Sequence, residues 1–255
     1  MQKKYAWTTL LTSEDYLQPV LNLQYSLRRV RSEYPLVIIV TDTIFMEVIS
    51  TLQANNCNFY VVPDLQRMHD DNNNDSTFRV NMLMKFYSFE LTEYSKVCYI
   101  DGDSLFLKNC DFIFSYRAPA AKHLGWEHLP IQDTPPEKIG IFAGELMVLE
   151  PGTFSMEYFF SHPNMAGCWD EAILRDNFGP QRIAHLPITD THYIYHAHTT
   201  GEKNRYWEYY NIYSEQALNN FLDSHSITNT WNMDWNRIKE QRKAEEERLK
   251  ELSIK

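Results

Sequence analysis

An unbroken run of apolar, mainly β-branched residues is the feature that most constrains the fold of this chain. Residues 36–40 read LVIIV and follow Pro35. Such a run is typical of a strand that is buried on both faces of a parallel sheet, because a half-exposed strand would alternate with polar residues. Polar residues close the run at 41–43, and residues 44–53 are predicted to form a helix. The sequence therefore indicates an α/β domain at this point.

The segments around this run repeat the alternation of strands and helices. Strands are predicted over 5–11, 58–62 and 97–100, with later strands over 142–149 and 191–198. A helix is predicted to begin near Ser13, where Pro19 should kink or delay it. Helical spacing of apolar residues predicts a long helix over 77–94, and shorter helices are predicted over 153–160 and 170–176. This order favours a mostly parallel sheet flanked by helices.

The bulk properties limit the functional class. The chain has 255 residues and a net charge of −10, and its Lys and Arg residues cluster only near the end, where acids interleave them. This balance argues against binding nucleic acid through a basic face. No apolar run of about 18 residues is present to span a membrane.

Domain organisation and compartment are inferred from the same numbers. We expect one domain over residues 1–235, followed by a charged helix over 236–255. The N-terminus lacks the apolar core of a signal peptide, so a cytoplasmic location is expected. The four cysteines form no CxxC pair and are expected to be reduced, buried thiols.

Two aspartates follow the central strand within KVCYIDGDSLFLKN, residues 96–109. Residues i and i+2 of an extended chain point to the same side, so Asp101 and Asp103 can converge on one ion. Gly102 between them permits a close approach of backbone or ligand. The carboxyl ends of the strands are also where open α/β sheets bind ligands. The alternative is a turn in which the aspartates cap backbone amides.

Two enzyme classes place such an acidic pair after a hydrophobic strand. In haloacid-dehalogenase-type phosphatases the first aspartate is a nucleophile, but there the pair follows the first strand, and Thr or Val stands where this chain has Leu105. In nucleotide-sugar transferases the pair holds a divalent ion against a diphosphate, and a further ligand comes from far along the chain. His196 and His198 are both candidates for that ligand, because they lie two residues apart at the end of an apolar segment. Carboxylates with an imidazole suit Mn²⁺ better than Mg²⁺, which prefers oxygen ligands.

Several segments, in the right order, resemble motifs of the glycogenin-like glycosyltransferases of family 8, which have the GT-A fold. They are TTLLTSEDYL (8–17), LTEYSKVCYIDGDSLFLKN (91–109), FAGELMVLEP (142–151), WDEAIL (169–174) and HAHTTGEKNRYW (196–207). The chain departs from the family at Ser13, where Asn is usual, and at 143–145, where Asn, then Ser or Ala, then Gly are expected. Glu171 stands in place of Gln, and the usual Lys-Pro-Trp is absent from the last segment.

The resemblance implies a metal-dependent, retaining transfer of a hexose from a UDP-sugar donor to an acceptor hydroxyl. It implies metal ligation by Asp101, Asp103 and one or both of His196 and His198. Asp170 falls on the catalytic position, with Glu171 beside it. The positions expected to contact the nucleotide are Leu10, Thr12, Ser13, Tyr16, Lys85, Asp101, Gly102, Asp103, Gly201 and Lys203. The positions expected to contact the donor sugar are Ala143, Gly144 and Glu145.

Alternatives remain open at these positions. The altered residues at 143–145 and 171 also fit a nucleotide-sugar-binding protein of the same fold that has lost catalysis. Asp170 could instead be the N-cap of the helix predicted over 170–176. The sequence leaves open the donor sugar, the identity of the acceptor, and whether the chain forms a homodimer.

Overall fold

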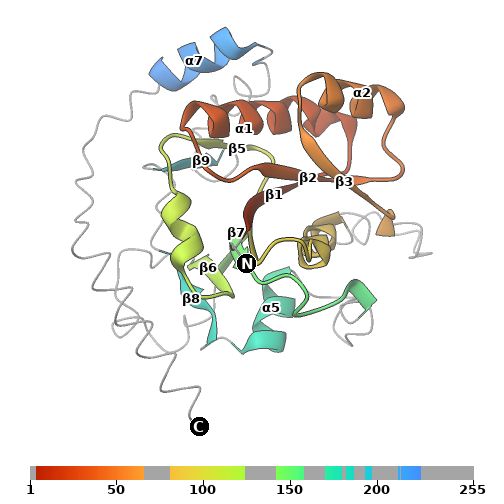
Figure 1. Ribbon diagram of the computed structural model, residues 1–255, viewed down its shortest axis with the longest axis vertical. Helices are drawn as coiled ribbons and strands as arrows, with labels where there is room; N and C mark the ends of the chain where they lie inside the picture. Colours follow the sequence, from red (N-terminus) through yellow and green to blue (C-terminus); the bar gives the residue numbers. More distant parts are fainter. Residues whose placement is uncertain are drawn as a thin grey trace.

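The buried run at residues 36–40 lies in strand β2 (Leu36–Thr41) of the computed structural model (Figure 1). All residues of β2 are buried. The strand pairs in parallel with β1 (Tyr5–Leu11) on one side and with β3 (Asn58–Val62) on the other. The structure describes residues 4–65, 81–123, 142–157, 170–179, 182–186, 193–196, 212 and 214–224. The charged helix predicted over 236–255 lies outside these ranges.

The main sheet has seven strands in the order β3-β2-β1-β4-β7-β6-β8. β4 (Lys96–Ile100) pairs in parallel with β1. β7 (Phe142–Leu149) is antiparallel to β4, and β6 (Ala120–His123) is antiparallel to β7. β8 (Ala184–His185) is parallel to β6. The predicted α/β class with a mostly parallel central sheet is confirmed.

The strand order reverses its direction between β1 and β4. The chain moves from β1 outward to β2 and β3 and then returns to add β4 on the other side of β1. In open α/β sheets such a reversal of strand order creates a crevice at the carboxyl ends of the two strands concerned. The segment that follows β1 carries positions predicted to contact the nucleotide, and the segment that follows β4 carries the acidic pair.

Helices cover both faces of the sheet (Figure 1). The short 3-10 helix η1 (Glu14–Tyr16) leads into α1 (Leu17–Arg29). Pro19 is therefore in the first turn of α1, where its missing N–H has no intrahelical partner, and the predicted delay of the helix is confirmed. Ser13 precedes η1 with extended backbone and makes no side-chain capping hydrogen bond. The other α-helices with described bounds are α2 (Met46–Ala54), α5 (Asp170–Phe178) and α7 (Glu215–Ser224).

The prediction of a long α-helix over 77–94 is wrong for most of the residues that the structure describes in this range. Residues 81–83 are α-helical, and η3 (Met84–Glu90) is a 3-10 helix. Residues 84–89 are all buried, so this segment has no solvent face. The apolar spacing that suggests an amphipathic α-helix here reflects burial from several sides instead.

Other segments differ from the prediction mainly in their extent. The strand predicted over 191–198 contains β9 (Ile194–His196), which pairs with β5 (Ser104–Phe106) in a separate two-stranded sheet. Of the helix predicted over 153–160, the described residues 156 and 157 are helical. A further 3-10 helix, η4 (Asp111–Ser115), follows β5. Within the described ranges, no helix has both the length and the apolar character needed to cross a membrane.

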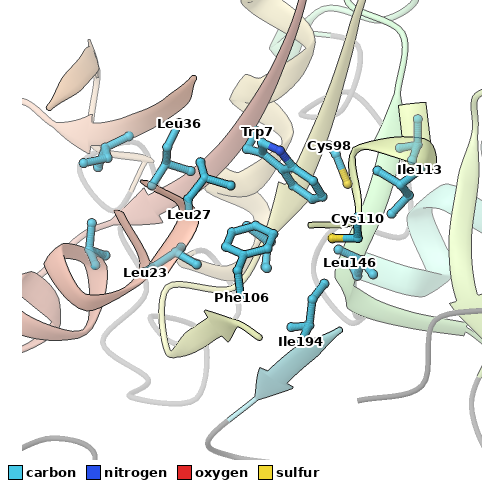
Figure 2. Packing of buried hydrophobic residues seen from close by; sticks show 14 of the residues in the cluster. Trp7, Leu23, Leu27, Leu36, Cys98, Phe106, Cys110, Ile113, Leu146 and Ile194 are labelled. Carbon is cyan, nitrogen blue, oxygen red and sulfur yellow. The ribbon is translucent and has the colours of Figure 1, made fainter. Parts of the chain in front are cut away.

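Alternate residues of the sheet pack into two different hydrophobic clusters, one on each face. Ile38 and Val40 lie in the cluster covered by α1 and α2, and Val37 and Ile39 lie in the cluster that contains residues of η3 and α5. Trp7 occupies the centre of the first cluster (Figure 2). This division explains the unbroken apolar run, since neither face of β2 meets solvent.

Aromatic edge-to-face contacts and buried thiols fill the cluster around Trp7. The Trp7 ring centroid lies 4.7 Å from that of Phe106 and 5.1 Å from that of Phe114. The predicted buried, reduced thiols are found at three positions, and Cys168 lies outside the described ranges. The three are Cys57, Cys98 and Cys110.

Candidate active site

The acidic segment forms a tight turn directly after β4. The backbone N–H of Ser104 donates to the Asp101 carbonyl at 3.2 Å. Gly102 packs against the exit of β1 and against α1: a Cβ at this position would lie 3.0 Å from Val20 Cγ2 and 3.4 Å from the Leu10 carbonyl oxygen. The turn and the site are therefore not exclusive alternatives, because the backbone makes the turn while the carboxylates of Asp101 and Asp103 extend from it.

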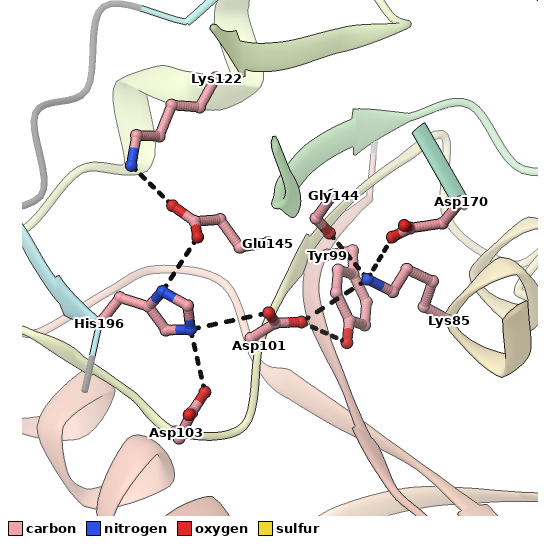
Figure 3. A network of polar contacts seen from close by, with 9 residues as sticks. All are labelled: Lys85, Tyr99, Asp101, Asp103, Lys122, Gly144, Glu145, Asp170 and His196. Carbon is pink, nitrogen blue, oxygen red and sulfur yellow. Dashed lines mark hydrogen bonds and ion pairs between the residues drawn. The ribbon is translucent and has the colours of Figure 1, made fainter. Parts of the chain in front are cut away.

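Pairing of β5 with β9 brings His196 beside this turn. Ser104 and His196 are directly opposite each other in the two-stranded sheet. His196 Nε2 lies 3.1 Å from Asp103 Oδ1 and 3.7 Å from Asp101 Oδ2 (Figure 3). One ligand atom from each of these three residues lies within 4.8 Å of the others. His198, the other histidine candidate, is outside the described ranges.

The three side chains fit a divalent ion by the chemistry of their donors. Two carboxylates and an imidazole form a mixed oxygen and nitrogen set, which suits Mn²⁺ and related transition metals better than Mg²⁺. Without an ion, these carboxylates and the imidazole face one another directly. The cluster of Asp101, Asp103 and His196 is called the metal cluster below.

The other ring nitrogen of His196 faces a second carboxylate. His196 Nδ1 lies 3.0 Å from Glu145 Oε2, and Glu145 Oε1 lies 2.6 Å from Lys122 Nζ. Burial lowers the pKa of His196, but hydrogen bonds to Asp103 and Glu145 and the nearby negative charges outweigh burial and raise it to about 10. Burial raises the pKa of Glu145, but His196 and Lys122 outweigh it and lower the value to about 2.

On the opposite side of the metal cluster, Lys85 is buried against Asp170. Lys85 Nζ lies 2.5 Å from Asp170 Oδ2 and donates to the Gly144 carbonyl at 3.1 Å. A Cβ at Gly144 would overlap the Asp170 carboxylate and lie 3.2 Å from Lys85 Nζ. The missing side chain at 144 therefore creates the space that the Asp170 carboxylate occupies. Asp170 is the first residue of α5, and its side chain is fully buried.

Asp101 joins the two sides into one network (Figure 3). Its Oδ1 accepts a hydrogen bond from the Tyr99 hydroxyl at 2.8 Å and lies 3.8 Å from Lys85 Nζ. Burial raises the pKa of Asp101, while Lys85 and His196 oppose that rise. Charged side chains in contact with one another thus form a continuous series from Lys122 to Asp170.

The structure describes some of the remaining predicted site residues and leaves others outside its described ranges. Leu10, Thr12, Ser13 and Tyr16 lie at the carboxyl end of β1 and in the segment that leads into α1, and Tyr16 is 40% exposed. Ala143 is buried in β7. The side chain of Glu171, together with Gly201 and Lys203, lies outside what the structure describes.

Two members of the network carry no motif signal in the sequence. Tyr99 belongs to the apolar strand before the acidic pair, where an aromatic residue predicts packing. Lys122 follows two alanines in the short strand β6 and precedes His123, so nothing in the local sequence marks it as the partner of a buried carboxylate.

The pKa of His196 leads to a pH prediction for the metal-free protein. Because the folded-state pKa of His196 is raised from 6.5 to about 10, its stabilising contribution is complete below pH 6.5 and is lost as pH rises toward 10. The depressed pKa of Glu145 contributes above 4.5 and is lost only toward pH 2. We therefore expect the free energy of unfolding to decrease as the pH rises from 6.5 toward 10. Urea unfolding of the chelator-treated protein at several pH values measures how steeply the free energy of unfolding falls with pH. The His196→Gln variant should show a smaller dependence on pH. Equal slopes in both proteins would contradict the prediction.

Curated proteins that resemble this chain include several glycosyltransferases. The putative UDP-glucuronate:xylan alpha-glucuronosyltransferase 3 of Arabidopsis thaliana is 29% identical over 163 residues, which is 64% of this chain and 24% of the relative. Galactinol synthase 3 of Arabidopsis thaliana is 30% identical over 117 residues, 44% of this chain and 34% of the relative. Glycogenin-1 of Caenorhabditis elegans is 28% identical over 125 residues, 48% of this chain and 29% of the relative. The chain thus spans about a quarter to a third of the length of these relatives. No protein-family model matches it.

Solved structures with a similar fold include glycosyltransferases as well. The glycosyltransferase GlyE of Streptococcus pneumoniae superposes with a TM-score of 0.54 and 13% identity, covering 89% of this chain and 64% of GlyE. The galactosyltransferase LgtC, in complex with donor and acceptor sugar analogues, superposes with a TM-score of 0.50 and 14% identity, covering 91% of this chain and 99% of LgtC. At these identities the likeness establishes the fold. The chain therefore has the GT-A fold and is similar in sequence to xylan glucuronosyltransferases, galactinol synthases and glycogenin, in line with the resemblance of its motifs.

Proposed function

We propose that this chain is a divalent-metal-dependent, retaining glycosyltransferase that moves a hexose from a UDP-sugar to an acceptor hydroxyl. The observation that carries the proposal is the metal cluster at the carboxyl end of β4, with Lys85 and Asp170 directly beside it. This arrangement lies at the β1/β4 reversal of a GT-A fold, where nucleotides bind in open α/β sheets. The names of the xylan glucuronosyltransferases support a UDP-linked donor.

Asp101, Asp103 and His196 would hold the ion, and Mn²⁺ is preferred to Mg²⁺ because one ligand is an imidazole. A bound divalent ion supplies Lewis-acid stabilisation for a diphosphate leaving group. The chain has a net charge of −10, so a cation at this place also removes the repulsion between the acidic site and a diphosphate. His198 stays a predicted ligand.

The crevice at the end of β1 would bind the nucleotide. Leu10, Thr12, Ser13 and Tyr16 line the exit of β1, and the partly exposed ring of Tyr16 can stack on a flat base. Gly102 packs closely on the Leu10 carbonyl, which supports the proximity of the acidic turn to the end of β1. Gly201 and Lys203 stay predicted contacts to the diphosphate.

Asp170 would act at the reacting sugar, with Lys85 holding its carboxylate in place. The 2.5 Å contact between the Lys85 ammonium and the Asp170 carboxylate supports this positioning role of Lys85. Ala143 and Gly144 border this point from β7 and are proposed to flank the donor sugar. Glu171 stays a predicted neighbour of the reacting centre.

Donor turnover tests this function directly. UDP release is measured from a panel of UDP-hexoses and UDP-glucuronate with Mn²⁺, with Mg²⁺ and with a chelator, both alone and with simple sugar acceptors. We expect slow UDP release from at least one donor that requires the metal and is faster with Mn²⁺. Tight binding of UDP with Mn²⁺ but no turnover of any donor would instead show a binding protein. Hydrolysis of simple phosphate monoesters with Mg²⁺, with UDP-sugars untouched, would show a phosphatase and overturn the proposal.

A further inference from the structure

An irregularity in the sheet places Glu145 next to the metal cluster. On β6, Ala121 is opposite Met147, but the next residue, Lys122, is opposite Ala143. Residues 144–146 of β7 therefore have no partners on β6, because they lie between the partners of two consecutive β6 residues. The regular pairing of the two strands is interrupted there. Such bulges redirect side chains and are frequent next to active sites.

The backbone of Glu145 is fixed to the acidic turn. Its carbonyl accepts a hydrogen bond from the Asp101 N–H at 3.0 Å. The side chain is 11% exposed, and both of its oxygens have charged partners: Oε1 lies 2.6 Å from Lys122 Nζ, and Oε2 lies 3.0 Å from His196 Nδ1 (Figure 3). Glu145 is thus held at the backbone by one member of the metal cluster and at the side chain by another.

The two nitrogens of His196 face different partners. Nε2 faces Asp103 and Asp101, and Nδ1 faces Glu145. An imidazole that ligates a metal through one nitrogen carries its proton on the other, and in metal sites that N–H usually donates to a carboxylate. Glu145 is placed to accept this hydrogen bond, and Lys122 is placed to hold the accepting carboxylate.

The described residues around Glu145 leave little room for a substrate. The cavity beside Glu145, Lys122 and His196 has a volume of about 10 Å³ and is otherwise lined mainly by apolar side chains. This volume suits about one water molecule and is far too small for a sugar ring.

We propose that Glu145 is a positioning residue for the metal: its carboxylate, held by Lys122, fixes the tautomer and orientation of His196 so that Nε2 is presented to the ion. This inference rests on the proposed function for the presence of the ion. It differs from the donor-sugar contact that the motif predicts for Glu145, and the experiment separates the two roles.

The experiment measures Mn²⁺ affinity without any sugar transfer. Mn²⁺ is titrated into the full chain, with and without UDP, and the free ion is followed by its EPR signal. We expect Glu145→Gln to weaken Mn²⁺ binding by about 10- to 100-fold, as removal of such outer partners does in other metal sites. Glu145→Asp, which keeps the carboxylate, should recover part of the affinity.

A double variant distinguishes positioning from simple structural support. Lys122→Met/Glu145→Leu removes the buried charge pair together and leaves no unpaired ion, so the fold should be kept. If Glu145 acts through His196, the folded double variant still binds Mn²⁺ about 10- to 100-fold more weakly than the unaltered chain. If the pair only supports the fold, the double variant binds Mn²⁺ normally and the inference is overturned. Removal of the surface pair by Arg29→Met/Asp223→Leu, whose atoms lie 3.0 Å apart, is the matched control and should leave the affinity unchanged.

The outcomes also separate this inference from the proposed function. Unchanged Mn²⁺ affinity in the Glu145 variants, with a raised KM for the donor alone, would make Glu145 a sugar contact and would overturn only the positioning role. Failure of the unaltered chain to bind Mn²⁺, with and without UDP, would overturn the metal dependence and the positioning role together.

Discussion

Replacement of Asp103 by Asn is expected to reduce sugar transfer by about a thousandfold or more. Asp103 is buried, and its Oδ1 lies 3.1 Å from His196 Nε2 at the centre of the metal cluster. The amide keeps the shape of the side chain but removes a charged ligand. Metal stabilisation of a developing charge is worth several kcal/mol, which corresponds to about three factors of ten in rate.

The loss should be visible in binding as well as in rate. Titration of Mn²⁺ with UDP should show an affinity at least about 100-fold lower in Asp103→Asn, while the thermal unfolding midpoint stays close to that of the unaltered chain. The matched control is Asp223→Asn, which removes a carboxylate from an exposed ion pair with Arg29. Because exposed pairs contribute little, the control should change neither transfer nor affinity. A sugar-transfer rate in the Asp103→Asn variant equal to that of the unaltered chain would contradict the proposed role of the metal cluster.

Replacement of Asp170 by Asn is expected to lower kcat by about 10²- to 10³-fold without weakening UDP and Mn²⁺ binding by more than a few-fold. The Asp170 carboxylate is buried on Lys85 at 2.5 Å and fills the space that Gly144 leaves open. An isosteric amide removes the negative charge with little change in packing. A group that stabilises charge at the reacting centre contributes mainly to the transition state, so kcat falls while ground-state binding is kept.

This result would separate catalysis from helix capping. If Asp170 served only the fold, at the start of α5 and in the buried pair with Lys85, its replacement should lower the free energy of unfolding and leave the transfer rate of the folded protein intact. Glu215→Gln is the matched control, because Glu215 is also the acidic first residue of a helix, α7. We expect the control to transfer sugar normally. Donor turnover and urea unfolding of both variants, measured on the same preparations, decide between the two roles.

Much of the fold follows from local patterns. The strands β1 and β3 have the bounds expected from their sequences, and β2 contains the predicted apolar run. A strand that is buried on both faces has apolar residues at consecutive positions. Such a strand, like β2, can therefore be recognised from its own sequence without knowledge of the neighbouring strands. The same logic fails at η3, where burial from several sides produces helical spacing in a 3-10 segment.

Part of the candidate site also follows from the sequence. The position of Asp101 and Asp103 at the carboxyl end of a central strand is a local property, since one strand and one turn define it. The family resemblance adds His196 and Asp170 as candidates through their own motifs. Nothing local shows that Lys122 and Tyr99 take part, because each lies inside an ordinary strand.

The sequence by itself determined the fold class, the strand that carries the acidic pair, and the kind of chemistry to expect. Only the tertiary structure decided which charges meet. Asp103 and His196 are 93 residues apart, and Lys85 and Asp170 are 85 apart. The first pair meets because β5 and β9 adopt one particular register, and Glu145 meets Lys122 and His196 because β6 and β7 slip out of regular pairing. The hydrophobic pattern is a local property that can be read from consecutive residues, whereas strand register and bulges depend on the packing of the whole domain.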